Sequence, residues 1–270
     1  MAFDPRPIGV FDSGVGGLSV VRAIVEAMPF ESIVYLGDTA RLPYGTKSRE
    51  TVIRYARRAA RVLAERDVKM VVVACNTASA VALGALSDLL APVPVVGVVE
   101  PGARAAVATG ARRILVLATE GTVRGGAYER AIARIRPEAS VASVACPLFV
   151  GLAEEGWTDG QVPRLVAEAY VAPHRTPPPE AVVLGCTHFP LLADAIAEAC
   201  GSKAVLVDSA ATTAAQVKAR LRAREAEAPI GPPGRIELFA TDGVDRFARV
   251  GGRFLGRPID PTDVQLVNLP

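Results

Sequence analysis

The chain has 270 residues, of which 50% are hydrophobic and 21% are charged, and its formal net charge is +2. This composition is typical of a globular protein with enough apolar side chains for one large core or two smaller ones. A nearly neutral chain gives no reason to expect a nucleic acid or an anionic membrane surface as partner. We find no signal peptide pattern and no apolar run long enough to span a membrane.

Short apolar runs rich in β-branched residues alternate along the chain with longer, alanine-rich amphipathic segments. The predicted strands are residues 8–11, 33–37, 70–74, 95–98, 113–117, 140–144, 181–184, 204–207 and 236–240. The predicted helices are residues 18–27, 48–65, 78–90, 125–134, 161–169, 190–199 and 211–224. Nearly continuous apolar strands separated by helices are typical of parallel sheets covered on both faces. The pattern therefore predicts an α/β protein.

Several predicted strands end directly in polar or reactive residues. These strand ends are Asp12-Ser13, Asp38-Thr39, Cys75-Asn76-Thr77, Cys186-Thr187-His188 and Asp208-Ser209. In open parallel sheets, ligands bind beyond the carboxyl ends of the strands. We therefore expect a functional site at this edge.

Two pairs of strand ends have similar sequences. VVVACNT, which contains Cys75, matches AVVLGCTH, which contains Cys186. IGVFDSG, which contains Asp12, matches VLVDSA, which contains Asp208. The similarity predicts two related halves with the cysteines facing each other across a cleft.

The four cysteines are at positions 75, 146, 186 and 200, and no C-x-x-C motif is present. Such spacing does not indicate a disulfide scaffold, a zinc knuckle or a thioredoxin motif. We expect reduced thiols in a cytoplasmic protein. Cys146 and Cys200 lack polar neighbours and are predicted to be packing residues.

Two facing thiols suit the inversion of a stereocentre that carries a weakly acidic C–H bond. One group removes the proton from one face, and a similar group delivers a proton to the other face. A neighbour or a helix N-terminus is expected to bring a thiol pKa near physiological pH, with Asp12 assisting Cys75 and His188 assisting Cys186. Nearby donors suit the carboxylates of an amino acid: Ser13, Asn76, Thr77 and Thr187.

A reaction without a cofactor is favoured. The Gly14-Val15-Gly16-Gly17 turn does not complete a dinucleotide motif, because Ser19 occupies its last position. No lysine stands at a strand end in a context that suggests a Schiff base. A zinc site formed by Cys75, Cys186 and His188 is a less favoured alternative.

Taken together, eight stretches resemble the glutamate racemases of the cofactor-independent aspartate/glutamate racemase superfamily. They are IGVFDSGVGGLSV (8–20), YLGDTARLPYGTKS (35–48), VVVACNTASA (71–80), VVGVVEPG (95–102), LATEGTVRGGAY (117–128), CPLFVGLAEEG (146–156), VVLGCTHFPLL (182–192) and VDSA (207–210). Two positions depart from the family pattern: Phe189 replaces the more usual tyrosine, and Gly151 replaces a frequent proline.

The resemblance implies roles for individual residues. Cys75 and Cys186 would be the two catalytic acid/bases, with the first deprotonating D-glutamate and the second L-glutamate. Asp12 would assist Cys75, and Glu154 and His188 would assist Cys186. The implied substrate contacts are Asp12, Ser13, Tyr44, Gly45, Asn76, Thr77, Thr187 and His188, with Thr119 and Thr122 in addition.

The resemblance also implies two pseudo-symmetric α/β domains with the active site in the cleft between them. One domain would comprise residues 1–98 and 208–270, and the other residues 99–207. The strands that end at Asp12 and Asp208 would then share a sheet. Family members supply D-glutamate for peptidoglycan and are commonly homodimers, so we expect a homodimer here.

Three alternatives remain open at this point. A racemase of aspartate or of another amino acid would differ in its pocket for the side-chain carboxylate. A thiol hydrolase would use one cysteine with a histidine and would form a trappable acyl-enzyme. A non-catalytic amino-acid sensor would bind glutamate without exchanging its Cα proton.

Overall fold

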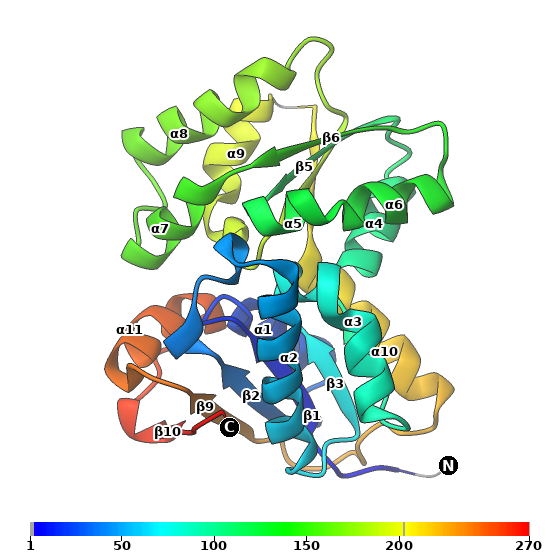
Figure 1. The fold of residues 1–270 in the computed structure, drawn as a ribbon, viewed down its shortest axis with the longest axis vertical. Coiled ribbons are helices and arrows are strands. Elements are labelled where there is room, and N and C mark those ends of the chain that lie inside the picture. The colour runs from blue at the N-terminus through cyan, green and yellow to red at the C-terminus, as the bar shows by residue number, and fades with distance from the viewer. Residues whose placement is uncertain (1–2, 202, 270) are drawn as a thin grey trace.

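A computed structural model describes residues 3–201 and 203–269 as two α/β units, one above the other in Figure 1. Each unit contains one sheet whose neighbouring strands run parallel, which confirms the predicted fold class. The strands are β1 (Ile8–Asp12), β2 (Ile33–Gly37), β3 (Met70–Val73), β4 (Val95–Gly97), β5 (Arg113–Ala118), β6 (Ser140–Ala145), β7 (Ala181–Gly185), β8 (Val205–Asp208), β9 (Ile236–Ala240) and β10 (Val264–Leu266).

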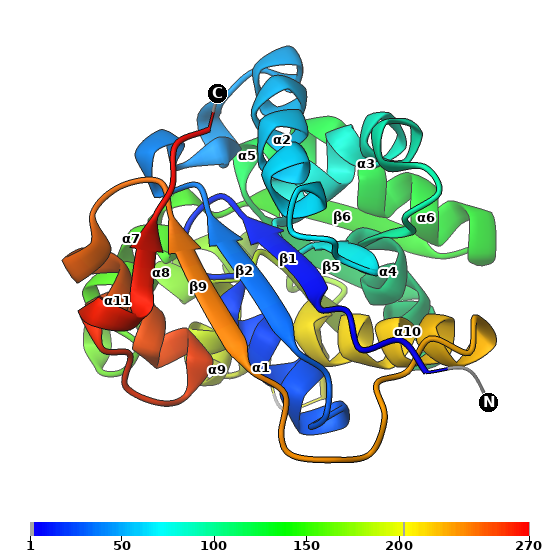
Figure 2. The ribbon, with the colours of Figure 1, turned by 90° about the horizontal axis from the view of Figure 1, so that it is seen from below.

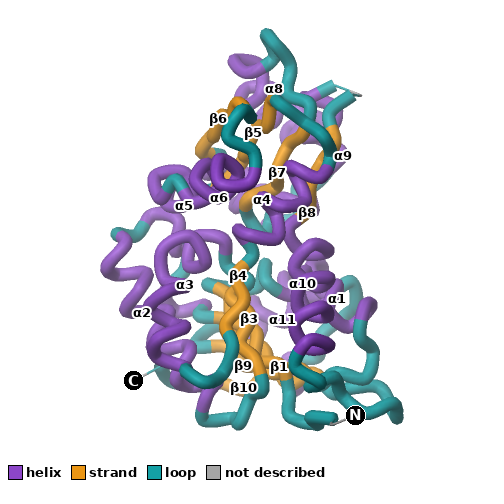
Figure 3. Tube along the Cα trace, turned by 90° about the vertical axis from the view of Figure 1, so that its right-hand side faces the viewer, coloured by secondary structure: helices purple, strands orange, loops and turns teal. Residues whose placement is uncertain are grey.

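The first sheet has the strand order β10-β9-β2-β1-β3-β4, and Figure 2 shows β9, β2 and β1 side by side. Side chains that alternate along each strand enter two separate cores: Ile8 and Val10 enter one, and Phe11 enters the other. The helices lie on both faces, as Figure 3 shows. One face carries α1 (Leu18–Ala27), α10 (Ser209–Ala223) and α11 (Val244–Leu255), and the other carries α2 (Arg49–Ala64) and α3 (Asn76–Leu90).

The second sheet has the strand order β6-β5-β7-β8. Along β5, Leu115 and Leu117 enter one core, whereas Ile114 and Val116 enter the other. One core contains residues of α7 (Pro147–Glu155), α8 (Gln161–Val171) and α9 (Ala193–Cys200). The other contains residues of α4 (Val99–Ala108), α5 (Glu120–Gly125) and α6 (Ala127–Ile135). Each unit therefore has a sheet buried on both faces.

Four strands of each sheet share one topology. The orders β2-β1-β3-β4 and β6-β5-β7-β8 are the same when strands are counted along the chain within each unit. In this correspondence β3 matches β7, and β4 matches β8. Cys75 and Cys186 therefore follow equivalent strands, as their similar sequences predicted.

The expectation that the strands ending at Asp12 and Asp208 share a sheet is wrong. The strand β8 pairs with β7 at the edge of the second sheet, whereas β1 lies inside the first sheet. The Asp208 carboxylate accepts a hydrogen bond of 2.8 Å from the Ala210 N–H and caps α10. Aspartate before a helix is favoured for capping alone, so the similar letters did not indicate equivalent strands.

The chain crosses between the two units twice. The helix α4 follows β4 of the first sheet but packs against α6 and β7 of the second unit. Conversely, α10 follows β8 of the second sheet but packs against α1 of the first unit. The crossings lie next to residues 98 and 208, which we retain as proposed domain boundaries.

Four helices and a strand were not predicted: α4, α5, α7, α11 and β10. The helix predicted over residues 125–134 corresponds to α6, which begins only at Ala127 because Gly126, with a φ of 57°, separates it from α5. None of the helices in the described part of the chain is both long and apolar enough to cross a membrane.

Candidate functional site

Cys75 and Cys186 line one cavity between the two units, so the predicted cleft joins them. Cys75 is 5% exposed and caps α3, where its Sγ accepts a hydrogen bond of 3.5 Å from the Ala78 N–H. Cys186 is 6% exposed and follows β7. The cavity is lined by Ser13, Gly14, Leu42, Pro43, Tyr44, Gly45, Cys75, Asn76, Thr77, Thr119, Val150, Glu154, Cys186, Thr187 and His188.

The free space in this cavity is small, about 30 Å³. That is room for about two water molecules. This free space is smaller than an amino acid with two carboxylates.

Beside Cys75 lie the carboxyl of Asp12, the last residue of β1, and the hydroxyl of Ser13 in the turn that follows. The Cys75 Sγ donates a hydrogen bond of 3.5 Å to Ser13 Oγ. Asp12 is fully buried; its Oδ2 accepts a hydrogen bond of 3.0 Å from the Gly14 N–H. Its Oδ1 has no hydrogen-bond partner among the described residues. Burial raises the pKa of Asp12, although the nearby His188 opposes that effect.

The expected lowering of the thiol pKa is wrong for Cys75. Burial raises the pKa of this thiol to about 12, and the neighbouring Asp12 carboxylate adds to the effect. The helix N-terminus and the Ser13 hydroxyl act in the opposite direction but are weaker. Its surroundings therefore favour the protonated form of the Cys75 thiol.

Cys186 has an imidazole as its neighbour. The Cys186 Sγ lies 3.8 Å from His188 Nδ1, and the other ring nitrogen, Nε2, lies 3.1 Å from Glu154 Oε1. The His188 ring also packs edge-on against Phe254, with 5.1 Å between ring centres. Burial alone would lower the pKa of His188, but Cys186 and Glu154 together raise it to about 10. A protonated imidazole thus places positive charge beside the Cys186 sulfur.

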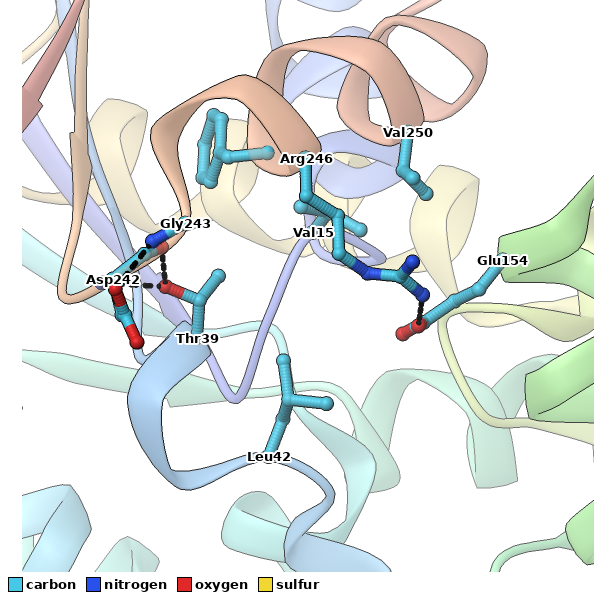
Figure 4. Close-up of a pocket in the computed structure, with 9 residues that line it drawn as sticks. Val15, Thr39, Leu42, Glu154, Asp242, Gly243, Arg246 and Val250 are labelled. Atoms are coloured by element: carbon cyan, nitrogen blue, oxygen red, sulfur yellow. Dashed lines mark hydrogen bonds and ion pairs between the residues drawn. The ribbon is translucent and has the colours of Figure 1, made fainter.

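Glu154 has a second cationic partner that the sequence reasoning missed. Its Oε2 lies 2.9 Å from the Arg246 guanidinium, which extends from α11 of the first unit (Figure 4). Burial would raise the pKa of Glu154, but hydrogen bonds from His188 and Arg246 outweigh it and lower the pKa. No motif marks Arg246. The amphipathic pattern of residues 244–255 was the signal that could have placed it on a helix facing the cleft.

Polar donors gather on the side of the cavity near α3. The hydroxyls of Thr77, Thr119 and Thr122 lie within 2.9–3.2 Å of one another. Asn76 Oδ1 accepts a hydrogen bond of 2.7 Å from Tyr128, whereas its buried Nδ2 has no partner in the described part of the chain. The amide of Asn76 is thus a donor available to a ligand.

The predicted contact Tyr44 does not present its hydroxyl to the cavity. That hydroxyl donates a hydrogen bond of 2.7 Å to Asp38 Oδ2 and is buried. The backbone at the next residue, Gly45, lies close to Thr119, because a Cβ at Gly45 would lie 2.7 Å from Thr119 Cβ. Asp12 and Thr122 are buried but are not among the lining residues. The other predicted site residues line the cavity.

The remaining cysteines lie elsewhere. Cys146 and Cys200 are buried in the core that contains α8 and α9, which confirms that they are packing residues. The described residues contain no group of three or more His, Cys, Asp or Glu side chains that could hold a metal ion.

The chain is similar to proteins of known family over most of its length. The family model described as Asp/Glu/Hydantoin racemase matches residues 8–217. The glutamate racemase of Geobacter metallireducens is 52% identical, with 98% of this chain and 97% of the relative covered. The glutamate racemase of Francisella tularensis in complex with D-glutamate has a TM-score of 0.92 at 33% identity, with 99% of both chains covered. That of Thermus thermophilus in complex with β-chloro-D-alanine has a TM-score of 0.88 at 42% identity, with 98% of both chains covered. The chain therefore belongs to the Asp/Glu/Hydantoin racemase family.

Proposed function

We propose that this protein interconverts L-glutamate and D-glutamate without a cofactor, using Cys75 and Cys186 as acid/bases. The observation that carries the proposal is the pair of thiols lining one cavity at equivalent strand ends. Thiols on opposite sides of a Cα atom can invert it, because proton removal from one face is followed by proton delivery to the other. Glutamate is proposed as substrate because the relatives compared above are named glutamate racemases.

The surroundings of the two thiols suit attack on L-glutamate. Burial raises the pKa of Cys75 to about 12. The Cys186 Sγ lies 3.8 Å from His188 Nδ1, and Cys186 and Glu154 together raise the pKa of His188 to about 10. Cys186 would remove the Cα proton of L-glutamate, and Cys75 would protonate the opposite face. The reverse reaction requires the proton to be on the other thiol.

Removing the Cα proton of D-glutamate requires a group that lowers the raised pKa of Cys75. A substrate α-ammonium near Asp12 would place positive charge beside Cys75 and offset the effect of burial on its pKa. Asp12 is buried and does not line the cavity, so we propose that its carboxylate attracts that ammonium through its charge rather than through a direct hydrogen bond. The Asn76 amide and the Thr77 and Thr187 hydroxyls are the proposed donors to a substrate carboxylate.

We further propose that the protein works in the cytoplasm as a homodimer and supplies D-glutamate for peptidoglycan. The four cysteines are free thiols, a state that a reducing compartment maintains. The peptidoglycan and homodimer proposals rest on the family resemblance.

The test replaces each cysteine separately by serine. C75S and C186S should each lower kcat for racemisation by about a thousandfold or more, because each loses an acid/base. C146S is the matched control, since Cys146 is buried but does not line the cavity. Racemisation is followed by circular dichroism, and Cα–H exchange by NMR in deuterated water.

Near-native racemisation by either C75S or C186S in both directions would refute the two-base mechanism. The wild-type protein is assayed with glutamate and aspartate separately, without added cofactor. If the wild type turns over aspartate faster than glutamate, aspartate would be its preferred substrate. Glutamate binding without Cα–H exchange would favour a sensor, and trapping of an acyl-enzyme would favour a thiol hydrolase.

A further inference from the structure

The helix α11 of the first unit contacts the Cys186 side of the cavity through one face. Arg246 Nη2 lies 2.9 Å from Glu154 Oε2, and Arg253 Nη1 donates a hydrogen bond of 3.0 Å to the Glu154 carbonyl. The Phe254 ring packs edge-on against His188. Residues seven and eight positions apart lie on the same side of a helix. The whole face is therefore directed at the end of α7 and the imidazole beside it.

Arg246 occupies the outer end of a chain of polar contacts. The chain runs from Arg246 through Glu154 and His188 to Cys186, with distances of 2.9, 3.1 and 3.8 Å. Arg246 is also 3.4 Å from Glu155 Oε1, on the exposed side. The side chain of Arg246 is 49% exposed, whereas that of Glu154 is only 12% exposed. Arg246 thus connects solvent with a mostly buried carboxylate that holds the imidazole.

We propose that Arg246 is a positioning residue for the second acid/base, orienting Glu154 so that the carboxylate holds His188 against Cys186. This inference rests on the proposed function. One Glu154 oxygen bonds His188 and the other bonds Arg246, so the carboxylate cannot rotate without losing a charge-assisted hydrogen bond. Without Arg246 the carboxylate is free to turn toward solvent, and the imidazole loses its fixed orientation.

The contact between Arg246 and Glu154 depends on how close the two units lie. Arg246 belongs to α11, which packs on the first sheet, whereas Glu154, His188 and Cys186 belong to the second unit. The guanidinium therefore reaches Glu154 only when the two units are close. Opening of the cleft would release Glu154, and closure over a substrate would complete the chain of contacts to Cys186. Figure 4 shows this bridge at the edge of a second cavity, of about 260 Å³, between α11 and Glu154.

The test compares R246Q with R249Q. Arg249 lies on the same helix, is exposed and pairs with no carboxylate among the described residues, so R249Q removes the same charge without the contact. R246Q should lower kcat for L-glutamate by about tenfold, the effect of losing one charge-assisted hydrogen bond. R249Q should stay within about twofold of the wild type, and R246K should recover part of the loss.

Isotope effects separate positioning from a general structural defect. The two enantiomers have equal free energy, so any variant must change kcat/KM equally in both directions. If the proton step at Cys186 slows, the primary deuterium isotope effect on kcat should rise for Cα-deuterated L-glutamate. It should not rise for Cα-deuterated D-glutamate, whose deuteron goes to Cys75.

An unchanged kcat in R246Q, or isotope effects that change equally for both enantiomers, would overturn the inference. If R246Q does not fold, as judged by thermal unfolding, R246K is measured in the same way, because its single ammonium loses the guanidinium geometry. Wild-type protein that does not racemise glutamate would refute the proposed function itself. Racemising wild type with an unaffected R246Q would refute only the role of Arg246.

Discussion

The two cysteine sites have the same place in the topology, but different charged groups lie beside the two thiols. Cys75 follows β3, caps a long helix and is next to Asp12 and Ser13, and no cationic side chain of the described residues is in hydrogen-bond contact with it. Cys186 follows the equivalent β7 but precedes only a 3₁₀ turn, and its neighbour is an imidazole held by a carboxylate. Equivalent strands therefore determine where the thiols lie, while the charged groups beside the two thiols differ.

This difference bears on how one cavity can act on two mirror-image substrates. A perfectly symmetric site would give both thiols the same pKa, and both would be protonated in a buried cavity. The histidine on one side supplies the positive charge that the other side lacks. In the proposed reaction, the Cys75 side would obtain its positive charge from the substrate ammonium. Substitutions at the contact between the two units, at His188 and in α7 test this difference between the two cysteine sites.

Among substitutions that keep both thiols, the largest effect is expected from Gly16→Ala. Gly16 lies in the turn of the Cys75 side but touches the Cys186 side, because a Cβ there would overlap Thr187 Oγ1 and lie 2.7 Å from His188 Nδ1. The added methyl should displace both residues or hold the units apart. A displacement of about 1 Å costs on the order of a hundredfold in rate, so kcat/KM for racemisation should fall by about that factor.

Gly84→Ala is the control for this substitution, because a Cβ at Gly84 on α3 meets nothing within 4 Å. It should leave the steady-state kinetics unchanged. A G16A protein with native kcat/KM would mean that the Cys186 side does not depend on the close contact between the two units.

A smaller effect is expected from the raised pKa of His188. The groups that face it are Cys186, Glu154 and Asp12, and its pKa is about 10 in the folded protein against 6.5 in an unperturbed chain. Below pH 6.5 both the folded and unfolded chains bind the proton, and the contribution of His188 to stability is complete. Between pH 6.5 and 10 only the folded chain binds it, so the free energy of unfolding falls as pH rises.

Denaturant titrations at pH 6.5 and 8.5 measure this dependence. The wild type should lose about 2 kcal/mol more than His188→Gln over this range, because glutamine does not titrate. The pKa of Cys75 is also raised, from 9.0 to about 12, but the titration of this thiol in the unfolded chain near pH 8.5 is common to both proteins and cancels in the comparison. Equal pH dependence in the two proteins would show that His188 is not protonated beside Cys186.

Much of the fold was predictable because its strands are continuous apolar runs that end in polar residues. The equivalence of the Cys75 and Cys186 strands followed from the same reasoning. The prediction that β8 shares a sheet with β1 was wrong, because Asp208-Ser209 has the residues of a helix cap. A short sequence cannot distinguish such a cap from a ligand-binding strand end. Arg246 was missed for a different reason: its partner Glu154 is 92 residues away in the chain, and only packing of the two units brings them together.

The smallest effect is expected from Gly151→Ala in α7, the helix that carries Glu154. Gly151 is an exposed position inside this helix, and a Cβ there meets nothing within 4 Å. Alanine is favoured over glycine in a helix interior by about 0.5–1 kcal/mol, so G151A should raise the free energy of unfolding by that amount. Thermal and denaturant unfolding measure the gain, and kcat for both enantiomers should stay unchanged. A stabilised G151A with a lower kcat in only one direction would show that the Cys186 side requires a flexible α7. If kcat stays unchanged for both enantiomers, the difference between the two cysteine sites would instead come from the side chains around each thiol.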